Sequence, residues 1–381
     1  GTSRTFEVTV NVDEPISGID ENGIRKFYEV VDKLKKEHDM SIILVSHDLD
    51  IVKKYADKVI LLDKKILKEG TAEEVFESKE YKEIFHNSTR LTKDEKMDIV
   101  KDTSGLLCHK IGYVVLTSTD NIVLTKMVSL TAVGIYTNYA TIVTAVTTLL
   151  SRVLSSFIPT IGNFIISYEK EAVEDLYNKL LFVNLWFTSF CTVCLYVLLN
   201  PFIEIWLDDS FLLTGFTVAV LCAQFYIKGT QFISNAFING AGLFARDRIR
   251  PLIESVLNLV ISIILAKEIG IAGVFIGTCV SSLCTTTWRE PYLLYKNVFK
   301  SNAFPFIKKQ IVWVVLTCLA CVGFHRFCLS MPINILGLIG RILICGLGVN
   351  ILYIVLWFWT NEFKYFYNLI KEKILVILRR N

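Results

Sequence analysis

Charge is scarce in most of this 381-residue chain, and the scarcity is uneven. Charged residues make up only 20% of the sequence and hydrophobic residues 52%, whereas soluble domains carry about 25% charged residues. Residues 1–104 hold 41 of the charged side chains, and residues 105–381 hold 36. All 10 cysteines lie in the second part, so the first has none. These deficits exclude a wholly soluble enzyme, a disordered chain and a disulfide-rich secreted module.

The second part instead contains apolar runs that are long enough to cross a bilayer, which takes about 20 residues each. We expect about eight spans. They lie at residues 105–127, 132–151, 180–199, 211–231, 251–267, 271–288, 310–329 and 334–359. The sequence therefore predicts a mainly α fold, a polytopic transmembrane helix bundle behind a small polar head.

The loops between these spans predict the orientation in the membrane. Alternate loops carry nearly all the lysines and arginines, which collect on the cytoplasmic side of membrane proteins. The loop between the fourth and fifth spans is one of the basic ones, and we assign to it Lys228, Arg246, Arg248 and Arg250. With an even number of spans, both termini face the cytoplasm.

Ionisable residues inside the spans are the sharpest functional signal, because each is costly in lipid unless it is paired or hydrated. Asp120 lies near the middle of the first span, beside Asn121, with Lys110 and Lys126 towards its two ends, where they can snorkel to the interfaces. Arg341 lies in the last span. A polar cavity for a charged substrate or ion and a structural Asp–Lys or Asp–Arg pair both fit this pattern. The C-x-x-C pairs on these helices predict buried thiols and no metal site.

Six stretches of the second part, taken in order and spacing, resemble the C-terminal half of bacterial polysaccharide flippases, which are related to the MATE transporters of the MOP superfamily. The resemblance covers about residues 90–381. The stretches are residues 107–112 (LCHKIG), 118–122 (STDNI), 133–139 (VGIYTNY), 199–207 (LNPFIEIWL), 250–254 (RPLIE) and 270–278 (GIAGVFIGT).

This resemblance implies a multi-pass protein of the bacterial cytoplasmic membrane that moves undecaprenyl-diphosphate-linked oligosaccharides between leaflets. It implies a substrate cavity formed by Lys110, Asp120, Asn121, Lys126, Arg152 and Arg341. The cations are candidates for binding the diphosphate or sugar acids, and Asp120 for ion coupling. The first lobe of such flippases has no counterpart here, so we expect it as a partner, besides the lipid bilayer. No nucleic acid is expected.

The polar head alternates between strand and helix patterns. Residues 8–12, 41–46 and 58–63 read as strands, and residues 24–38 and 50–55 as helices. This alternation predicts a small α/β segment with a mostly parallel sheet and a ligand edge at the carboxyl ends of its strands.

Polar residues suited to nucleotide chemistry follow two of these strands. Asp13 can hold Mg²⁺, Glu14 can polarise water, and His47 can bond a γ-phosphate. With their flanking residues they resemble the C-terminal end of an ABC-transporter ATPase of the zinc or manganese importer type. That likeness implies that Asp13 is the Walker B aspartate, Glu14 the catalytic base, Asp20 the D-loop aspartate and His47 the switch histidine.

The P-loop motif G-x-x-x-x-G-K-[ST] is absent from the 381 residues, as are the ABC signature and the Q-loop. The P-loop NTPase-type segment is therefore incomplete, and we expect it to bind ATP and Mg²⁺ only if a complete ABC site, such as a partner subunit's, is supplied. We expect no enzyme activity. Residues 1–88 thus form a partial ATPase segment and residues 89–381 a flippase-like half. The alternatives are a remnant of an ABC importer subunit and a non-functional chimeric reading frame.

Overall fold

The computed structural model describes most of the chain, with gaps. The described residues are 9–13, 28–31, 33, 41–45, 49–63, 65–82, 96, 97, 100, 103, 104, 107, 110, 112, 114, 120, 122–155, 158–243, 247 and 249–378. Two compact units divide the chain, Gly1–Asp98 and Ile99–Asn381. Each is described by itself.

The first unit contains a parallel strand pair, as expected. Strand β1 (Thr9–Asp13) pairs with β2 (Ser41–Val45), and Asp13 lies opposite Val45 at the carboxyl ends of both strands. Helix α2 (Leu49–Tyr55) follows β2. Tyr28, which is helical as predicted, stacks on Tyr55 of α2 with ring centroids 4.8 Å apart. The strand and helix assignments are confirmed over these residues.

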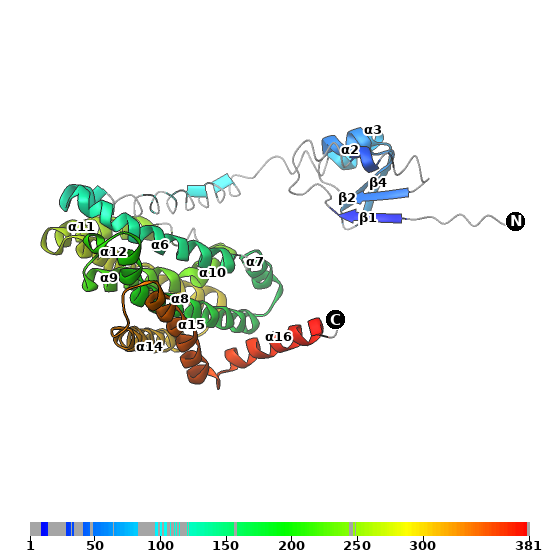
Figure 1. Ribbon diagram of the computed structural model, residues 1–381. Coiled ribbons are helices and arrows are strands. Elements are labelled where there is room, and N and C mark those ends of the chain that lie inside the picture. Colours follow the sequence, from blue (N-terminus) through cyan, green and yellow to red (C-terminus); the bar gives the residue numbers. More distant parts are fainter. Residues whose placement is uncertain are drawn as a thin grey trace. The chain divides into compact units, whose positions relative to one another are not determined.

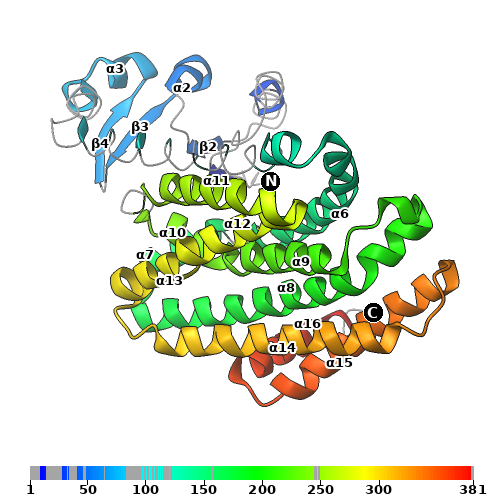
Figure 2. The ribbon, with the colours of Figure 1, turned by 90° about the vertical axis from the view of Figure 1, so that its left-hand side faces the viewer.

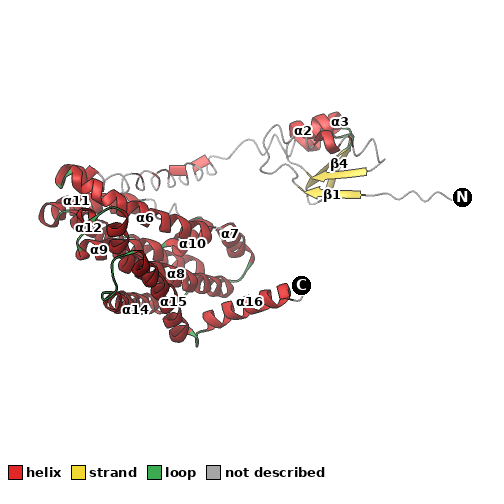
Figure 3. Cartoon of the chain, in the orientation of Figure 1, coloured by secondary structure: helices red, strands yellow, loops and turns green. Residues whose placement is uncertain are grey.

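The third predicted strand forms, but its pairing differs from the expectation. Strand β3 (Val59–Asp63) pairs antiparallel with β4 (Lys65–Gly70), which we had not predicted. One intervening residue can join only a hairpin, because a parallel pair needs a crossover of a dozen residues or more. Among the described residues the sheets are therefore one parallel and one antiparallel pair (Figure 3). Helix α3 (Ala72–Phe76) follows β4.

The second unit is a bundle of helices, so the mainly α prediction is confirmed (Figure 1). Its described helices are α6 (Leu130–Ser155), α7 (Ile158–Ser167), α8 (Lys170–Trp206), α9 (Gly215–Thr230), α10 (Phe232–Gly240), α11 (Arg250–Ile269), α12 (Ile271–Cys284), α13 (Thr286–Leu294), α14 (Phe304–Cys328), α15 (Ile335–Trp357) and α16 (Asn361–Leu378). Two short turns, a 3₁₀ turn at Asp209–Phe211 and a π turn at Tyr295–Phe299, join them.

Within the described residues, 6 helical runs are long and apolar enough to cross a membrane. They are Leu130–Ser167, Lys170–Trp206, Gly215–Gly240, Ile271–Phe299, Phe304–Cys328 and Ile335–Trp357. The expected count of about eight is not confirmed. Most of residues 105–127 lie outside the described part, and α11, which covers the predicted span 251–267, carries four charged residues in its 20.

The core of the bundle lies around α8, which runs alongside α9 and α14 in Figure 2. Ser189 of α8 is hydrogen-bonded to Tyr353 of α15 at 2.7 Å, and Trp186 donates to Asn350 at 2.9 Å. Trp313 of α14 stacks on Trp357 at the end of α15, with centroids 4.9 Å apart. These polar and aromatic contacts fix α14 and α15 against the long central helix.

Three glycines shape the α11–α12 pair: Gly270 at the joint, and Gly273 and Gly277 at the close contact. Gly270, with φ of 60°, joins the helices in a conformation that favours glycine, and α12 then runs back along α11. A Cβ at Gly277 would lie 2.8 Å from the backbone nitrogen of Ser262, and one at Gly273 would overlap the backbone of Leu265. The G-x-x-x-G spacing of these two glycines is a common device for close helix contact in membranes. It positions the polar side chains of the candidate site.

Candidate functional site: a polar cluster around Asp120

Asp120, in the first predicted span, is buried against the α11–α12 pair. The exposed fraction of Asp120 is only 9%. The hydroxyl of Thr278 on α12 lies 3.3 Å from both carboxylate oxygens of Asp120. Asn258 of α11 donates to the same hydroxyl oxygen at 2.7 Å. The immediate neighbours of this carboxylate are thus neutral donors.

Further oxygen atoms lie beside this cluster. Asn258 is fully buried, and its Oδ1 atom has no hydrogen-bond partner among the described residues. Ser262, one turn along α11, donates to the carbonyl of Val274 at 3.1 Å. Carboxylate, amide and carbonyl oxygens are ligands that hard cations prefer. A buried carboxylate among such oxygens can hold a small cation or a proton.

Lys228 is the basic residue that interacts with this carboxylate. Lys228 belongs to α9, inside the membrane-spanning run Gly215–Gly240, so its assignment to a cytoplasmic loop is wrong. Its side chain is exposed and interacts electrostatically with Asp120 without a direct ion pair. The signal was present in the sequence, because the predicted span 211–231 already contained Lys228.

Arg152 ends a polar stripe on the exposed face of α6. The stripe consists of hydroxyl side chains spaced three or four residues apart: Thr137, Thr141, Thr144, Thr148 and Ser151. Thr137 and Thr141 donate to carbonyls of their own helix, at 2.7 and 2.8 Å. Such a face suits water or a polar partner better than lipid tails.

The other predicted cavity residues are not gathered at Asp120. Lys110 and Lys126 are exposed, and Asn121 lies outside the described residues. Arg341 is buried, and its guanidinium donates to the carbonyls of Met331 at 2.7 Å and Pro332 at 3.0 Å. These bonds tie Arg341 to the turn between α14 and α15. The predicted substrate roles of these residues stay predictions.

An apolar groove of about 280 Å³ lies between α6, α8 and α15. Its lining is entirely hydrophobic and comprises Ile142, Val146, Phe190, Cys191, Cys194, Leu195, Leu198, Leu199, Phe202, Leu338 and Ile342. A groove of this size and chemistry can accept a hydrocarbon chain. No three His, Cys, Asp or Glu side chains in the described part of the chain form a group that could hold a metal ion.

The nucleotide-type residues of the first unit lie mostly beyond what the structure describes. The parallel register brings the carboxyl ends of β1 and β2 to one edge, with Asp13 as the last residue of β1. Glu14, Asp20 and His47 lie outside the described residues. The register therefore places Asp13 beside Val45 at this edge.

About a fifth of the chain is similar to the ATP-binding proteins of ABC transporters. It is 46% identical over 74 residues to the zinc import ATP-binding protein ZnuC 2 of Aliivibrio fischeri, which is 19% of this chain and 30% of that protein. It is 42% identical over 71 residues to the energy-coupling factor transporter ATP-binding protein EcfA2 of Enterococcus faecalis, 18% of this chain and 25% of that one. The chain thus spans less than a third of the length of these relatives. No family model and no solved structure matches.

Proposed function

We propose that the membrane unit is half of a transporter that moves lipid-linked polysaccharide repeat units across the bacterial cytoplasmic membrane. The observation that carries the proposal is the pair of opposite charges within the membrane helices, a buried Asp120 and an exposed Lys228. Intramembrane ionisable groups are rare and mark substrate or ion pathways. A purely structural pair would be joined directly, whereas these two groups are not.

Three surfaces suit the three parts of such a substrate. Lys228 and Arg152 are exposed cations that can bind a diphosphate. The hydroxyl stripe of α6 offers donors and acceptors to sugar hydroxyls. The apolar groove between α6, α8 and α15 offers about 280 Å³ to part of an isoprenoid tail.

The cluster around Asp120 is the proposed coupling site of the same transporter. A cation or proton that binds the carboxylate would neutralise it, and its release would restore the attraction to Lys228. Alternating access needs two bundles that move against each other, so we expect the missing first lobe to be supplied by a partner. Both termini are proposed to face the cytoplasm.

The test is transport of a fluorescent undecaprenyl-diphosphate oligosaccharide in proteoliposomes that contain the full chain, with and without a co-expressed flippase first lobe. We expect transport only when the lobe is present, and Lys228→Gln to slow it strongly. The matched control is Lys267→Gln at the exposed end of α11, which should leave transport unchanged. Equal loss in both variants, or no transport with any first lobe, would contradict the proposal.

The similarity to zinc-import ATP-binding proteins, together with the parallel β1–β2 pair, favours a second candidate, a remnant of an ABC importer subunit. Its expected signature is ATP binding by the full chain. Because no P-loop motif cradles the phosphates, we expect none to be detectable by equilibrium dialysis with radiolabelled ATP. Binding that is lost in Asp13→Asn would instead favour this second candidate.

A further inference from the structure

A second cluster of charges lies at the start of α11, apart from Asp120. Arg250 is bonded to three carboxylates: to Asp247, to Glu254 at 3.1 Å and to Glu290 of α13 at 3.0 Å. Thr286 also contacts Arg250 and Glu254. All three carboxylate residues are buried.

The charges of this cluster do not balance among the described residues. Against the three carboxylates stand two guanidiniums, those of Arg250 and Arg289, whose Nε lies 3.2 Å from Asp247. With all three carboxylates ionised, one negative charge is in excess among the described residues. A buried charge without compensation is strongly unfavourable, so a proton or a cation is expected there.

Glu290 is the carboxylate with an oxygen atom that can bind such a partner. Its Oε1 accepts from Arg250 and, at 3.1 Å, from Asn235 of α10. Its Oε2 is buried and has no hydrogen-bond partner, in a residue that is only 1% exposed.

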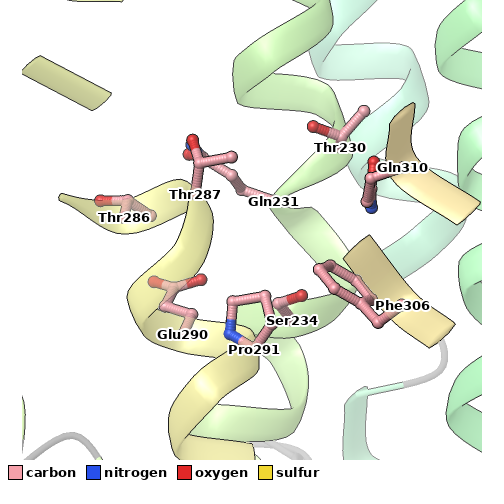
Figure 4. Close-up of a pocket in the computed structure, with 9 residues that line it drawn as sticks. All are labelled: Thr230, Gln231, Ser234, Thr286, Thr287, Glu290, Pro291, Phe306 and Gln310. Carbon is pink, nitrogen blue, oxygen red and sulfur yellow. The ribbon is translucent and has the colours of Figure 1, made fainter. Parts of the chain in front are cut away.

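Glu290 lines a small cavity together with neutral oxygen-bearing side chains from α9, α10 and α14 (Figure 4). The cavity has a volume of about 10 Å³, which leaves room for about one water molecule or small ion. In Figure 4, Glu290 shares this space with Thr287, Gln231 and Ser234. The space suits an ion or water and is too small for an oligosaccharide.

We propose that this cavity binds a small monovalent cation of the sodium class, with Glu290 Oε2 as the charged ligand and neighbouring hydroxyl oxygens as neutral ligands. One excess negative charge matches one positive charge. A divalent ion is disfavoured, because the three carboxylates are spread around Arg250 and do not converge on one point. The site lies beyond the proposed transport role of Asp120 and does not depend on it.

The experiment measures binding of ²²Na⁺ to the full chain in nanodiscs, with choline replacing sodium at constant ionic strength. All variants carry Asp120→Asn, so that binding at the Asp120 cluster does not contribute. We expect this background to bind one sodium ion, and added Glu290→Gln to weaken binding by about tenfold or more, the factor that corresponds to about 1.4 kcal/mol. Glu290→Gln keeps an oxygen acceptor for Arg250 and Asn235.

Two matched variants distinguish loss of a ligand from loss of charge, and a measurement of unfolding excludes misfolding. Glu254→Gln removes the same charge on the other side of Arg250 without lining the cavity, and should weaken binding clearly less than Glu290→Gln does. Thr287→Val keeps every charge and should weaken binding. Thermal unfolding in choline confirms that each variant is folded. The proposal is overturned if the Asp120→Asn background binds no sodium, which means ordered water only, or if Glu254→Gln loses as much binding as Glu290→Gln.

Discussion

Arg250 and Asp120 both carry charge into the helix bundle, but the neighbours of these two charges differ. Arg250 bonds directly to Glu254 and Glu290 at 3.1 and 3.0 Å, across α11 and α13. Asp120 lies against the neutral side chains of Thr278 and Asn258, and the cation that attracts it, Lys228, is exposed. Direct pairs hold helices in one geometry. A buried carboxylate held by neutral donors stays available to a mobile cation, so we expect the first cluster to govern stability and the second transport.

Replacing Arg250 with Met should have the largest effect on stability. It leaves three buried carboxylates without their shared cation, and breaking a buried pair in this way costs about 3–5 kcal/mol. We expect a large fall in the thermal unfolding midpoint in nanodiscs. Arg289→Met is the control, because that side chain is 39% exposed and contacts only Asp247 in the cluster. Equal midpoints for both variants would mean that the direct pairs do not hold these helices.

Adding a methyl group at Gly277 should have the next largest effect. The new Cβ would lie 2.8 Å from the backbone nitrogen of Ser262 and 3.0 Å from its Cα, so α11 and α12 must separate. Overpacking of this kind costs about 1–3 kcal/mol. Because the separation also moves Asn258 away from Thr278, Gly277→Ala should impair transport as well.

Gly346→Ala is the matched substitution in α15, where a Cβ would meet nothing within 4 Å. It should stabilise the protein by about 0.5–1 kcal/mol, since alanine loses less backbone entropy than glycine on helix formation. If Gly277→Ala is as stable as Gly346→Ala, the close approach of α11 and α12 is not required for the cluster around Asp120.

The sequence sufficed to predict what depends on local composition. The apolar runs predict α6, α8, α14 and α15, because a membrane helix satisfies its own backbone and needs only length and hydrophobicity. Asp120 stood out for the same reason, as a charge in an apolar run. The strands β1 and β3 and the helix α2 followed from short-range patterns in the same way.

What escaped prediction depends on contacts between distant residues. Thr278 lies 158 positions from Asp120, and nothing in either segment alone indicates the hydrogen bond between them. Glu290 is one acidic residue among many until Arg250 is seen beside it. Lys228 lies near the end of the predicted span 211–231, whereas α10 begins at Phe232 directly after α9 and extends the same helical run to Gly240. The antiparallel β3–β4 pair is a local exception, because the single residue between Asp63 and Lys65 already dictates a hairpin.

Asp120→Asn should sharpen the contrast with Arg250 by leaving stability almost unchanged. Asparagine retains an oxygen that accepts from Thr278, and it removes a buried charge that forms no direct ion pair with any described residue. We expect a change in unfolding free energy within about 1 kcal/mol, in either direction. The transport rate, in contrast, should fall strongly. A destabilisation as large as that of Arg250→Met would mean that Asp120 is a structural residue of the same kind.

The smallest effect on stability is expected for Lys228→Gln, because an exposed side chain outside a direct ion pair contributes little. The free energy of unfolding of the variant should lie within about 0.5 kcal/mol of the wild-type value.

The coupling between Lys228 and Asp120 is more informative. It is measured by a double-mutant cycle with Lys228→Gln and Asp120→Asn, on unfolding and on transport. We expect coupling of less than about 1 kcal/mol on unfolding, because the two charges interact through space only. On transport, the double variant should be no worse than either single one, since both charges serve one step. Additive losses in transport would instead assign Lys228 and Asp120 to separate steps, and the exposed lysine would then bind substrate independently of the ion site.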